Sequence, residues 1–365
     1  MWYIYLSTGF ICISYATLIS IFFVGWKRIP TFVSMQNEVI TTELSVVVAC
    51  RNEEACISEL ISCLAKQTFQ DFELIFINDH STDATRHLIK TAQATFPKIQ
   101  LIDAVGNGKK NALQEGIHKS TGELIITTDA DCSPSFNWLE TIAKFYKSYP
   151  SDLIICPVKL SGIDKLLINL QILEFTSLIA SGAGAAGAGM PILCNGANLV
   201  FTKNNWLDSQ ADLHAEEQSG DDMFLLESTK KRGATIQFLK SESAFVISKP
   251  SSSWREFIKQ RRRWTSKSTA YTDWQIIFTA CVVMAINLLI IILFSLSIIS
   301  SSFIIVFLSL ILFKYVLDSI FLNSVSKFFQ LNNIWIYSLL LSVIYPFYIV
   351  FTAFSTFLIK PTNWK

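Results

Sequence analysis

Long apolar stretches without charge lie at both ends of the chain. Residues 1–26 and 274–313 contain no charged residue, and neither does the stretch from about Ile334 to Phe357. About 20 apolar residues in a helix cross the roughly 30 Å hydrocarbon core of a bilayer. The first and last stretches therefore predict one span each, and residues 274–313 predict two, broken near residues 300–302. Of these four predicted spans, one could instead be re-entrant or interfacial.

The charges beside these stretches predict the topology. Lys27 and Arg28 follow the first span directly, and by the positive-inside rule they stay in the cytoplasm. The N-terminus would then lie outside and residues 27–273 in the cytosol. The first span lacks the basic start and the cleavage site of a signal peptide, so we expect a retained anchor. Four spans put the C-terminus outside, which Lys360 and Lys365 weakly oppose.

Two charges interrupt the C-terminal apolar region. Lys314 and Asp318 are four residues apart and so share a helix face. Charges inside a span often mark a functional site. The interpretation favoured here is a mutually neutralised pair near the interface, with the lysine reaching toward water.

The central region, by contrast, alternates apolar runs with amphipathic stretches. The runs lie at residues 44–50, 72–78, 99–104 and 123–128, and stretches of helical character separate them. This pattern predicts an α/β fold with a mostly parallel sheet and helices on both faces. Ligands of such sheets bind at the carboxyl ends of the strands. The side chains that follow these ends should converge on one crevice: Asn52, Asp79, Asp129 and Asp131.

Residues 163–180 are apolar nearly all round and predict a core helix or, slightly better, one in the membrane interface. Residues 181–189 are almost entirely Gly and Ala. They predict a flexible loop, although a small-residue surface packed against a span is equally compatible.

The composition differs between the central region and the two ends of the chain. The 365 residues are 51% hydrophobic and 16% charged, against about 25% charged in globular domains. Outside residues 27–273 only five charged residues occur, which excludes a fully soluble protein, a disordered chain and a fibrous repeat. A net charge of +1 gives no support for a nucleic-acid partner. The eight cysteines lack metal-binding spacing and indicate the free thiols of a reducing compartment.

Several acidic and basic residues are candidates for chemistry. Asp129 and Asp131 would point the same way in an extended chain and suit Mg²⁺ or Mn²⁺ that bridges phosphate oxygens. Asp221 and Asp222 open a stretch of helical character, where they either complement the helix dipole or supply a general base. Lys109 starts a helix after two glycines, where it meets phosphate or forms a solvated cap.

The segment at residues 251–264 predicts a helix with a defined start. Ser253 and Glu256 form a capping box, so the helix begins at Trp254. Gln260, Arg263 and Trp264 then share one face, a combination that suits a diphosphate and a sugar ring. The alternative is a basic helix drawn to anionic lipid, a role expected in any case of the two arginines at 261 and 262.

Five motifs in this order resemble those of family 2 glycosyltransferases of the GT-A fold. They are CRNEE at residue 50, QTFQDFELIFINDHSTDAT at 67, TTDADCSP at 127, SGDDMFLLE at 219 and QRRRW at 260. The resemblance covers residues 44–264, and the apolar ends are similar to those of the membrane-bound, cellulose- and hyaluronan-synthase-like members. It implies an inverting transfer of sugar from a nucleotide-diphosphate donor, with a UDP-sugar as the expected donor.

The resemblance also implies residue roles. The donor would be bound by Asn52, Glu53, Asp79, Lys109, Asp129, Gln260 and Arg263. The metal would be held by Asp129 and Asp131, Asp222 would be the general base, and Trp264 with Asp221 would meet the acceptor. The segment 195–198 resembles the acceptor side of the family, without assigned roles.

The expected domain organisation has three parts. Residues 1–26 form a membrane helix. Residues 27–273 form a cytosolic GT-A domain that includes interfacial helices at 163–180 and 254–266. Residues 274–359 form about three further membrane helices.

The resemblance also implies where the enzyme acts and on what. It would act at the cytosolic face of the cell membrane, its acceptor would be a polysaccharide or glycolipid, and export or assembly subunits could accompany it. Single addition to a lipid-linked acceptor is the close alternative, and an inactive scaffold that binds nucleotide sugar is disfavoured by the intact acids.

Overall fold

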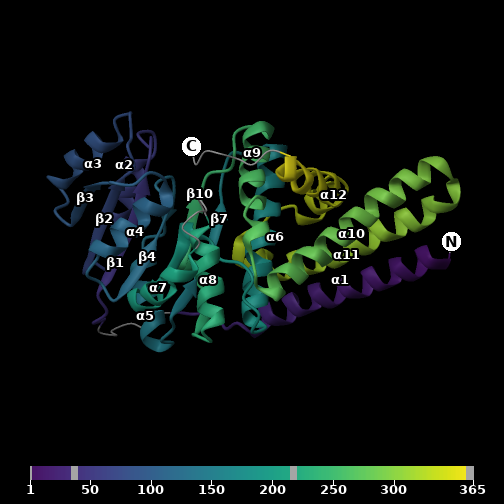
Figure 1. Ribbon diagram of the computed structural model, residues 1–365, viewed down its shortest axis with the longest axis horizontal. Helices are drawn as coiled ribbons and strands as arrows, with labels where there is room; N and C mark the ends of the chain where they lie inside the picture. Colours follow the sequence, from purple (N-terminus) through teal and green to yellow (C-terminus); the bar gives the residue numbers. More distant parts are fainter. Residues whose placement is uncertain (1, 34–39, 214–219, 359–365) are drawn as a thin grey trace. The chain divides into compact units, whose positions relative to one another are not determined.

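The computed structural model describes residues 2–33, 40–213 and 220–358, which form two compact units (Figure 1). The sheet unit comprises residues 29–161 and 193–249. Of the described residues, the helical unit comprises 2–28, 162–192 and 250–358. The stretches expected as interfacial helices of the central domain, 163–180 and 254–266, thus belong with the long apolar helices. The reason lies in their packing, described below.

The sheet unit is built on a seven-stranded sheet in the order β3-β2-β1-β4-β8-β6-β9. Its strands are β1 (Leu44–Cys50), β2 (Phe72–Asn78), β3 (Ile99–Asp103), β4 (Leu124–Thr127), β6 (Leu153–Ile155), β8 (Leu199–Thr202) and β9 (Ile236–Phe238). β1 pairs in parallel with β2 and β4, and only β8 runs antiparallel to its neighbours. This mostly parallel α/β sheet confirms the predicted fold class.

Helices cover the sheet and a second, short sheet lies beside it. The helices are α2 (Ile57–Ala65), α3 (Thr85–Gln93), α4 (Lys109–Lys119), α5 (Trp138–Ser148), α7 (Lys203–Ser209) and α8 (Asp221–Lys231), with 3₁₀ turns η1 (Gly196–Asn198), η2 (Gln210–Asp212) and η3 (Glu242–Ala244). The small sheet has the order β5-β10-β7, with β5 (Ser133–Pro134), β7 (Val158–Leu160) and β10 (Val246–Ser248).

The central strand is buried on both faces, as its uninterrupted apolar sequence requires. All seven residues of β1 are buried. α4 can pack closely on the sheet because Gly116 faces Ile77 and Val47, and a Cβ at that position would overlap both side chains. Since β1, β2 and β4 are parallel, their carboxyl ends lie at one edge, and the loops that follow these ends carry the candidate site.

The helical unit contains the long apolar helices. They are α1 (Trp2–Arg28), α6 (Leu166–Gly187), α10 (Trp274–Ile299), α11 (Ile304–Phe329) and α12 (Ile334–Leu358), joined by the shorter α9 (Trp254–Thr265), η4 (Ser268–Ala270) and η5 (Ser301–Phe303). The predicted break near residues 300–302 is confirmed, since α10 ends at Ile299 and α11 begins at Ile304.

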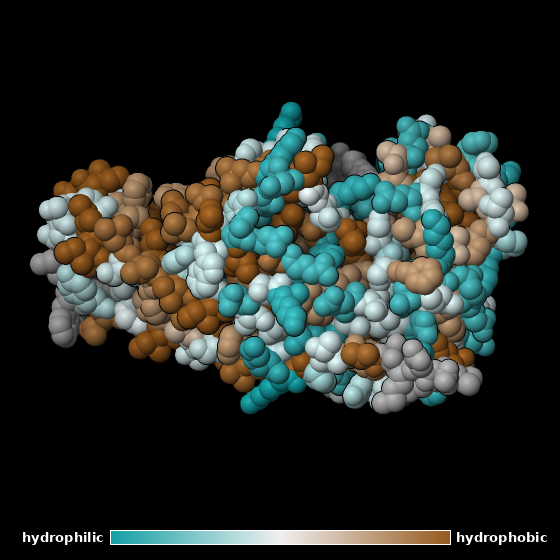
Figure 2. Space-filling model, turned by 180° about the vertical axis from the view of Figure 1, so that it is seen from behind, coloured by the Kyte–Doolittle hydropathy of each residue, from teal (hydrophilic) through white to brown (hydrophobic). Residues whose placement is uncertain are grey.

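Five described helices are long and apolar enough to cross a membrane, one more than predicted: α1, α6, α10, α11 and α12. Large apolar side chains on them face outward, as on α1 and α11, where Phe10 is 73% and Ile305 76% exposed. Figure 2 shows the resulting hydrophobic surface. In Figure 1, α1, α10 and α11 run in nearly one direction, whereas α6 and α9 run across it.

The prediction of a flexible loop at residues 181–189 is wrong, because α6 continues to Gly187. The equally compatible interpretation, a small-residue surface packed against a span, is confirmed, because the small residues pack against the candidate span α1. A Cβ on Gly184 would overlap the backbone of Phe22, and one on Gly25 would overlap the backbone of Gly184. Close helix approach of this kind needs small residues. Tertiary packing therefore overrides the weak helix preference of the glycines.

Lys314 and Asp318 on α11 form the mutually neutralised pair that we favoured. Lys314 Nζ lies 2.5 Å from Asp318 Oδ2, and the hydroxyl of Tyr15 on α1 donates to Asp318 Oδ1 at 2.6 Å. The lysine does not reach water, however, because its side chain is only 5% exposed. The charges instead join α1 to α11.

Candidate functional site

The loop after β2 places Asp79 beneath the start of α4. Asp79 is fully buried, and its backbone N–H donates to the carbonyl of Cys50 at the end of β1 (2.8 Å). Its carboxylate accepts a hydrogen bond from the N–H of Gly108, 3.1 Å from each oxygen, and pairs with Arg51 at 3.5 Å. Gly108 has a φ of 94°, which glycine adopts without strain. Asp79 thus joins two strand ends to the loop that begins α4.

The turn after β1 holds the two other residues predicted for the donor side. Asn52 is exposed, and its side-chain oxygen accepts a hydrogen bond from the N–H of Thr82 at 2.8 Å. Glu53 is only 8% exposed; its N–H donates to Thr85 Oγ1 at 2.7 Å, and its carboxylate accepts the thiol of Cys56 at 3.1 Å. Both residues lie at the predicted edge, but only Asn52 presents its side chain to solvent.

Lys109, the first residue of α4, brings a positive charge to this edge. Its Nζ lies 2.5 Å from Oδ1 of Asp129. Burial acts to lower the pKa of Lys109, but the charge and hydrogen bond of Asp129, together with the charges of Asp221 and Asp222, raise it above the ordinary lysine value. Lys109 is therefore a cation at physiological pH.

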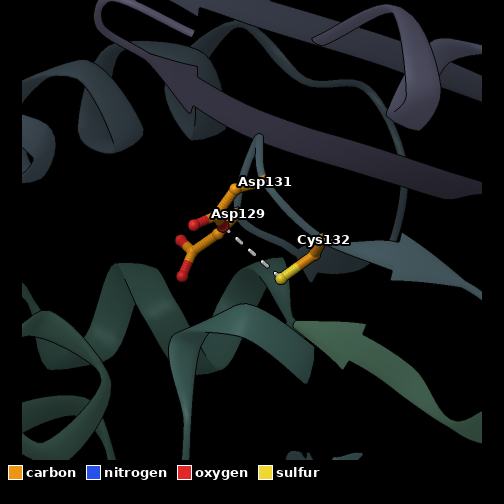
Figure 3. Close-up of side chains that lie close together, drawn as sticks. All are labelled: Asp129, Asp131 and Cys132. Carbon is orange, nitrogen blue, oxygen red and sulfur yellow. Dashed lines mark hydrogen bonds between the residues drawn. The ribbon is translucent and has the colours of Figure 1, made fainter. Parts of the chain in front are cut away.

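Asp129, Asp131 and Cys132 surround one small space (Figure 3). One potential ligand atom from each residue lies within 4.8 Å of the other two. The sequence predicts an extended chain at Asp129 and Asp131, but the structure has a turn there. β4 ends at Thr127, and the N–H of Cys132 donates to the Asp129 carbonyl at 3.1 Å, so a turn brings the two carboxylates together.

The two carboxylates fit a divalent cation. Mg²⁺ and Mn²⁺ prefer hard oxygen ligands, and Asp131 is exposed while Asp129 is half-buried, so further oxygens can reach them. Cys132 does not fit such a cation. Burial, and then the charges of Asp129 and Asp131, raise the pKa of its thiol far above the ordinary value, so it stays protonated.

Asp221 and Asp222 begin α8, after Gly220 in the left-handed conformation (φ 108°). The carboxylate of Asp222 accepts the N–H of Gly196 at 3.0 Å on Oδ2 and the N–H of Met223 at 2.9 Å on Oδ1. Asp222 is partly exposed. Two backbone donors therefore fix the orientation of a carboxylate that is still accessible. Its neighbour Asp221 is the first residue of the helix.

The segment at residues 195–198 supports Asp222 from the other side. Asn198 is fully buried; its amide N–H groups donate to the carbonyls of Pro157 and Ala244, and its oxygen accepts the indole N–H of Trp138 at 2.9 Å. This anchoring holds the turn that presents the N–H of Gly196. Sequence reasoning placed Gly196 in the acceptor-side segment and Arg51 in a motif but gave neither a role, because a backbone donor and an ion pair between loops leave no pattern along the chain.

Gln260, Arg263 and Trp264 lie on α9 in the helical unit. The capping box is confirmed in part: Ser253 Oγ accepts the N–H of Glu256 at 3.3 Å, but the Glu256 carboxylate bonds Ser252 instead of Ser253. Gln260, Arg263 and Trp264 are all partly exposed. Arg261, expected at the lipid surface, is instead 4% exposed and pairs with Glu174 on α6.

The sheet unit therefore brings most of the predicted residues to one edge. Asp79 accepts a hydrogen bond from Gly108, and the next residue, Lys109, pairs with Asp129. Lys109 also interacts electrostatically with Asp222. One cation lies among several carboxylates, beside a space with two oxygen ligands. Such an arrangement can bind a phosphorylated ligand with a divalent cation and hold a base next to it.

Residues 45–203 match the model of glycosyl transferase family 2. This central segment is therefore similar to family 2 glycosyltransferase domains. The matched segment includes the strands β1, β2 and β4, with Asp79, Lys109, Asp129 and Asp131, whereas Asp222 and α9 lie beyond it.

Curated relatives match part of this chain. It is 26% identical over 165 residues to poly-β-1,6-N-acetyl-D-glucosamine synthase of Staphylococcus epidermidis (43% of this chain, 39% of the relative). It is 33% identical over 115 residues to undecaprenyl-phosphate 4-deoxy-4-formamido-L-arabinose transferase of Shewanella sediminis (30% and 34%). The chain matches about a third of the length of these relatives.

The fold is also similar to that of a solved structure. The mannosyltransferase of Pyrobaculum calidifontis in complex with GDP-Man and Mn²⁺ is 13% identical, with a TM-score of 0.50 over 93% of this chain and 96% of that one. At this identity the similarity supports the fold and leaves the substrate open.

Proposed function

We propose that the protein is a membrane-bound inverting glycosyltransferase. It transfers a sugar from a nucleotide-diphosphate donor, a UDP-sugar, to a polysaccharide or glycolipid acceptor at the cytosolic face of the cell membrane. The observation that carries this proposal is the oriented carboxylate of Asp222, held by two backbone N–H groups beside the cluster of Lys109 and Asp129.

Asp222 acts as the general base. Its accessible carboxylate takes the proton from the attacking acceptor hydroxyl, which raises the nucleophilicity of that oxygen. The hydroxyl attacks the anomeric carbon from the face opposite the departing diphosphate, so one displacement inverts the configuration. The neighbouring Asp221 lies on the acceptor side.

The donor binds at the carboxyl edge of the sheet. Asp129 and Asp131 hold Mg²⁺ or Mn²⁺, which when bound neutralises charge on the departing diphosphate. Lys109 exchanges its contact with Asp129 for a diphosphate oxygen. Asn52 offers the exposed polar side chain, while the buried Asp79 and Glu53 shape the nucleotide pocket, Asp79 through Gly108 and Arg51.

The residues of α9 are assigned to the same reaction on the family resemblance. Arg263 suits a phosphate oxygen pair because its guanidinium is a planar fork, and Gln260 offers amide donors. Trp264 stacks on the apolar face of the acceptor sugar. These assignments rest on the helix face that the three residues share and on the family resemblance.

UDP-N-acetylglucosamine is the first donor to test, because the Staphylococcus epidermidis relative is named for a polymer of N-acetylglucosamine. The purified full-length protein should release UDP from it when a divalent cation and an acceptor are present. Excess chelator should stop the release, and added Mg²⁺ or Mn²⁺ should restore it. Full activity in excess chelator would remove the metal role from Asp129 and Asp131. Failure with every nucleotide sugar in a donor screen would overturn the enzyme proposal.

Product length distinguishes the two modes of transfer. The QRRRW segment favours repeated addition, whereas the similarity to an undecaprenyl-phosphate sugar transferase supports single addition to a lipid-linked acceptor. A ladder of polymers from the purified protein would establish repeated addition. One added sugar on an undecaprenyl phosphate acceptor would establish the alternative.

A further inference from the structure

A buried ion pair joins three helices of the helical unit. Arg261 on α9 is 4% exposed and Glu174, in the middle of α6, is 2% exposed. Nε of Arg261 donates to Glu174 Oε1 at 3.1 Å, and a second guanidinium nitrogen donates to Oε2. The hydroxyl of Tyr348 on α12 donates to the same Oε1 at 2.6 Å. The guanidinium is therefore fixed from α6, and the carboxylate from α12.

The same guanidinium contacts two residues of the proposed donor and acceptor site. Its remaining terminal nitrogen donates to Oε1 of Gln260 at 2.6 Å, which sets the orientation of that amide and the direction of its N–H donors. Its carbon lies 4.2 Å from the ring centroid of Trp264 and 4.6 Å from that of Phe257. Trp264 also packs on Phe175, the neighbour of Glu174, with ring centroids 6.1 Å apart.

A buried ion pair is a poor means of holding helices together, because the cost of removing both charges from water often equals the attraction gained. Apolar side chains of similar size would serve the packing as well. A lysine would also satisfy the charge of Glu174. Only a planar fork can bond Glu174 and Gln260 at once while stacking on Trp264.

We propose that Arg261 is a positioning residue that orients Gln260 and Trp264 for transfer, with Glu174 and Tyr348 as its supports. This inference rests on the proposed function, in which Gln260 meets the diphosphate and Trp264 the acceptor sugar. Arg261 itself is only 4% exposed, and each of its three guanidinium nitrogens donates to Glu174 or Gln260.

Arg261→Lys tests the inference. The variant keeps the charge beside Glu174 but loses the fork, so the melting temperature of the purified full-length protein should stay within a few degrees of wild type. Turnover with UDP-N-acetylglucosamine should fall about tenfold or more. Arg255→Lys, the same change at an exposed position of α9, is the matched control and should keep turnover within about twofold. Wild-type turnover in a stable Arg261→Lys protein would overturn the inference.

Two further comparisons separate positioning from a purely structural role. In a Gln260→Ala/Trp264→Ala background, Arg261→Lys should reduce turnover by no more than about threefold, because both groups that it orients are already gone. An undiminished loss in that background would overturn the inference. The double variant Glu174→Leu/Arg261→Met removes both buried charges, so it should be as stable as wild type and still slow. If this double variant were both as stable and as active as wild type, the ion pair would serve packing alone and the inference would be overturned.

The controls distinguish this inference from the proposed function. If the wild type uses no nucleotide sugar, or if Asp222→Asn keeps full turnover, the proposed function fails first. If wild type and Asp222→Asn behave as proposed but Arg261→Lys is as active as wild type, only the positioning role is lost.

Discussion

Asp222→Asn changes the proposed base while keeping its shape, and the structure sets how much stability the change should cost. The carboxylate accepts N–H groups from Gly196 and Met223, one on each oxygen. The asparagine oxygen can keep one of these bonds, but its NH₂ group must then face the other donor. A lost hydrogen bond to a charged group costs about 1.5–3 kcal/mol. Because one of the two bonds is retained, we expect a loss within this range, about 1.5–3 kcal/mol.

The expected loss of activity is much larger. A general base contributes about 10²–10⁴-fold to a rate, which corresponds to about 2.7–5.5 kcal/mol of activation free energy. Because native proteins are stable by about 5–15 kcal/mol, nearly all of the Asp222→Asn protein remains folded at 25 °C. A fall in turnover of 10²-fold or more therefore reflects lost chemistry.

The assay measures UDP release from UDP-N-acetylglucosamine at saturating donor, with UDP binding measured in parallel by calorimetry. UDP should bind Asp222→Asn within a few-fold of wild type, because the carboxylate is placed on the acceptor side. Asp208→Asn, the same change at an exposed position of α7, controls for the loss of a charge and should leave turnover unchanged. Retention of more than about a tenth of wild-type turnover in Asp222→Asn would refute the assignment of the base.

Three further predictions follow from packing and charge. Gly184→Leu should force α1 and α6 apart and cost about 1–3 kcal/mol, seen as a lower melting temperature, whereas Gly9→Leu, with open space around it, should not. Lys109→Met should raise the KM for the donor about tenfold with little change in melting temperature; an unchanged KM would contradict its phosphate role. The ion pair with Arg86 lowers the pKa of Asp103 from 3.8 to about 2, so its stabilising effect is present above pH 3.8 and lost as the pH falls toward 2. The stability difference between wild type and Asp103→Asn in denaturant titrations should shrink over that range, and a constant difference would contradict it.

The sheet and its edge were predictable because their signals are local. A continuous apolar run such as residues 44–50 is typical of a strand buried on both faces, and β1 is one. Parallel strands place their carboxyl ends at one edge, so the neighbourhood of Asp79 and Asp129 followed from the order of the runs. Their bonding atoms did not follow, because the N–H of Gly108 reaches Asp79 from a loop 29 residues away.

The helical unit was harder to predict because its contacts are distant in sequence. The glycines within residues 181–187 disfavour a helix whereas the alanines favour one, and the close approach of α1 explains why glycine occurs there. Arg261 sits in a basic run, which indicates a lipid-facing helix, yet its partner Glu174 lies 87 residues away. The small residues indicate close packing against a span without identifying α1, and the basic run gives no sign of Glu174.

The two charged clusters differ in a way that matches their proposed roles. A group that exchanges its partner for a ligand must be accessible, and the Lys109 and Asp129 side chains are 23% and 35% exposed. The Arg261 and Glu174 side chains are only 4% and 2% exposed, and exchanging either partner would leave an unpaired charge in an apolar interior, which is costly. The first pair can therefore open for a diphosphate and a cation. The second stays closed through the reaction, as a residue that holds others in place must.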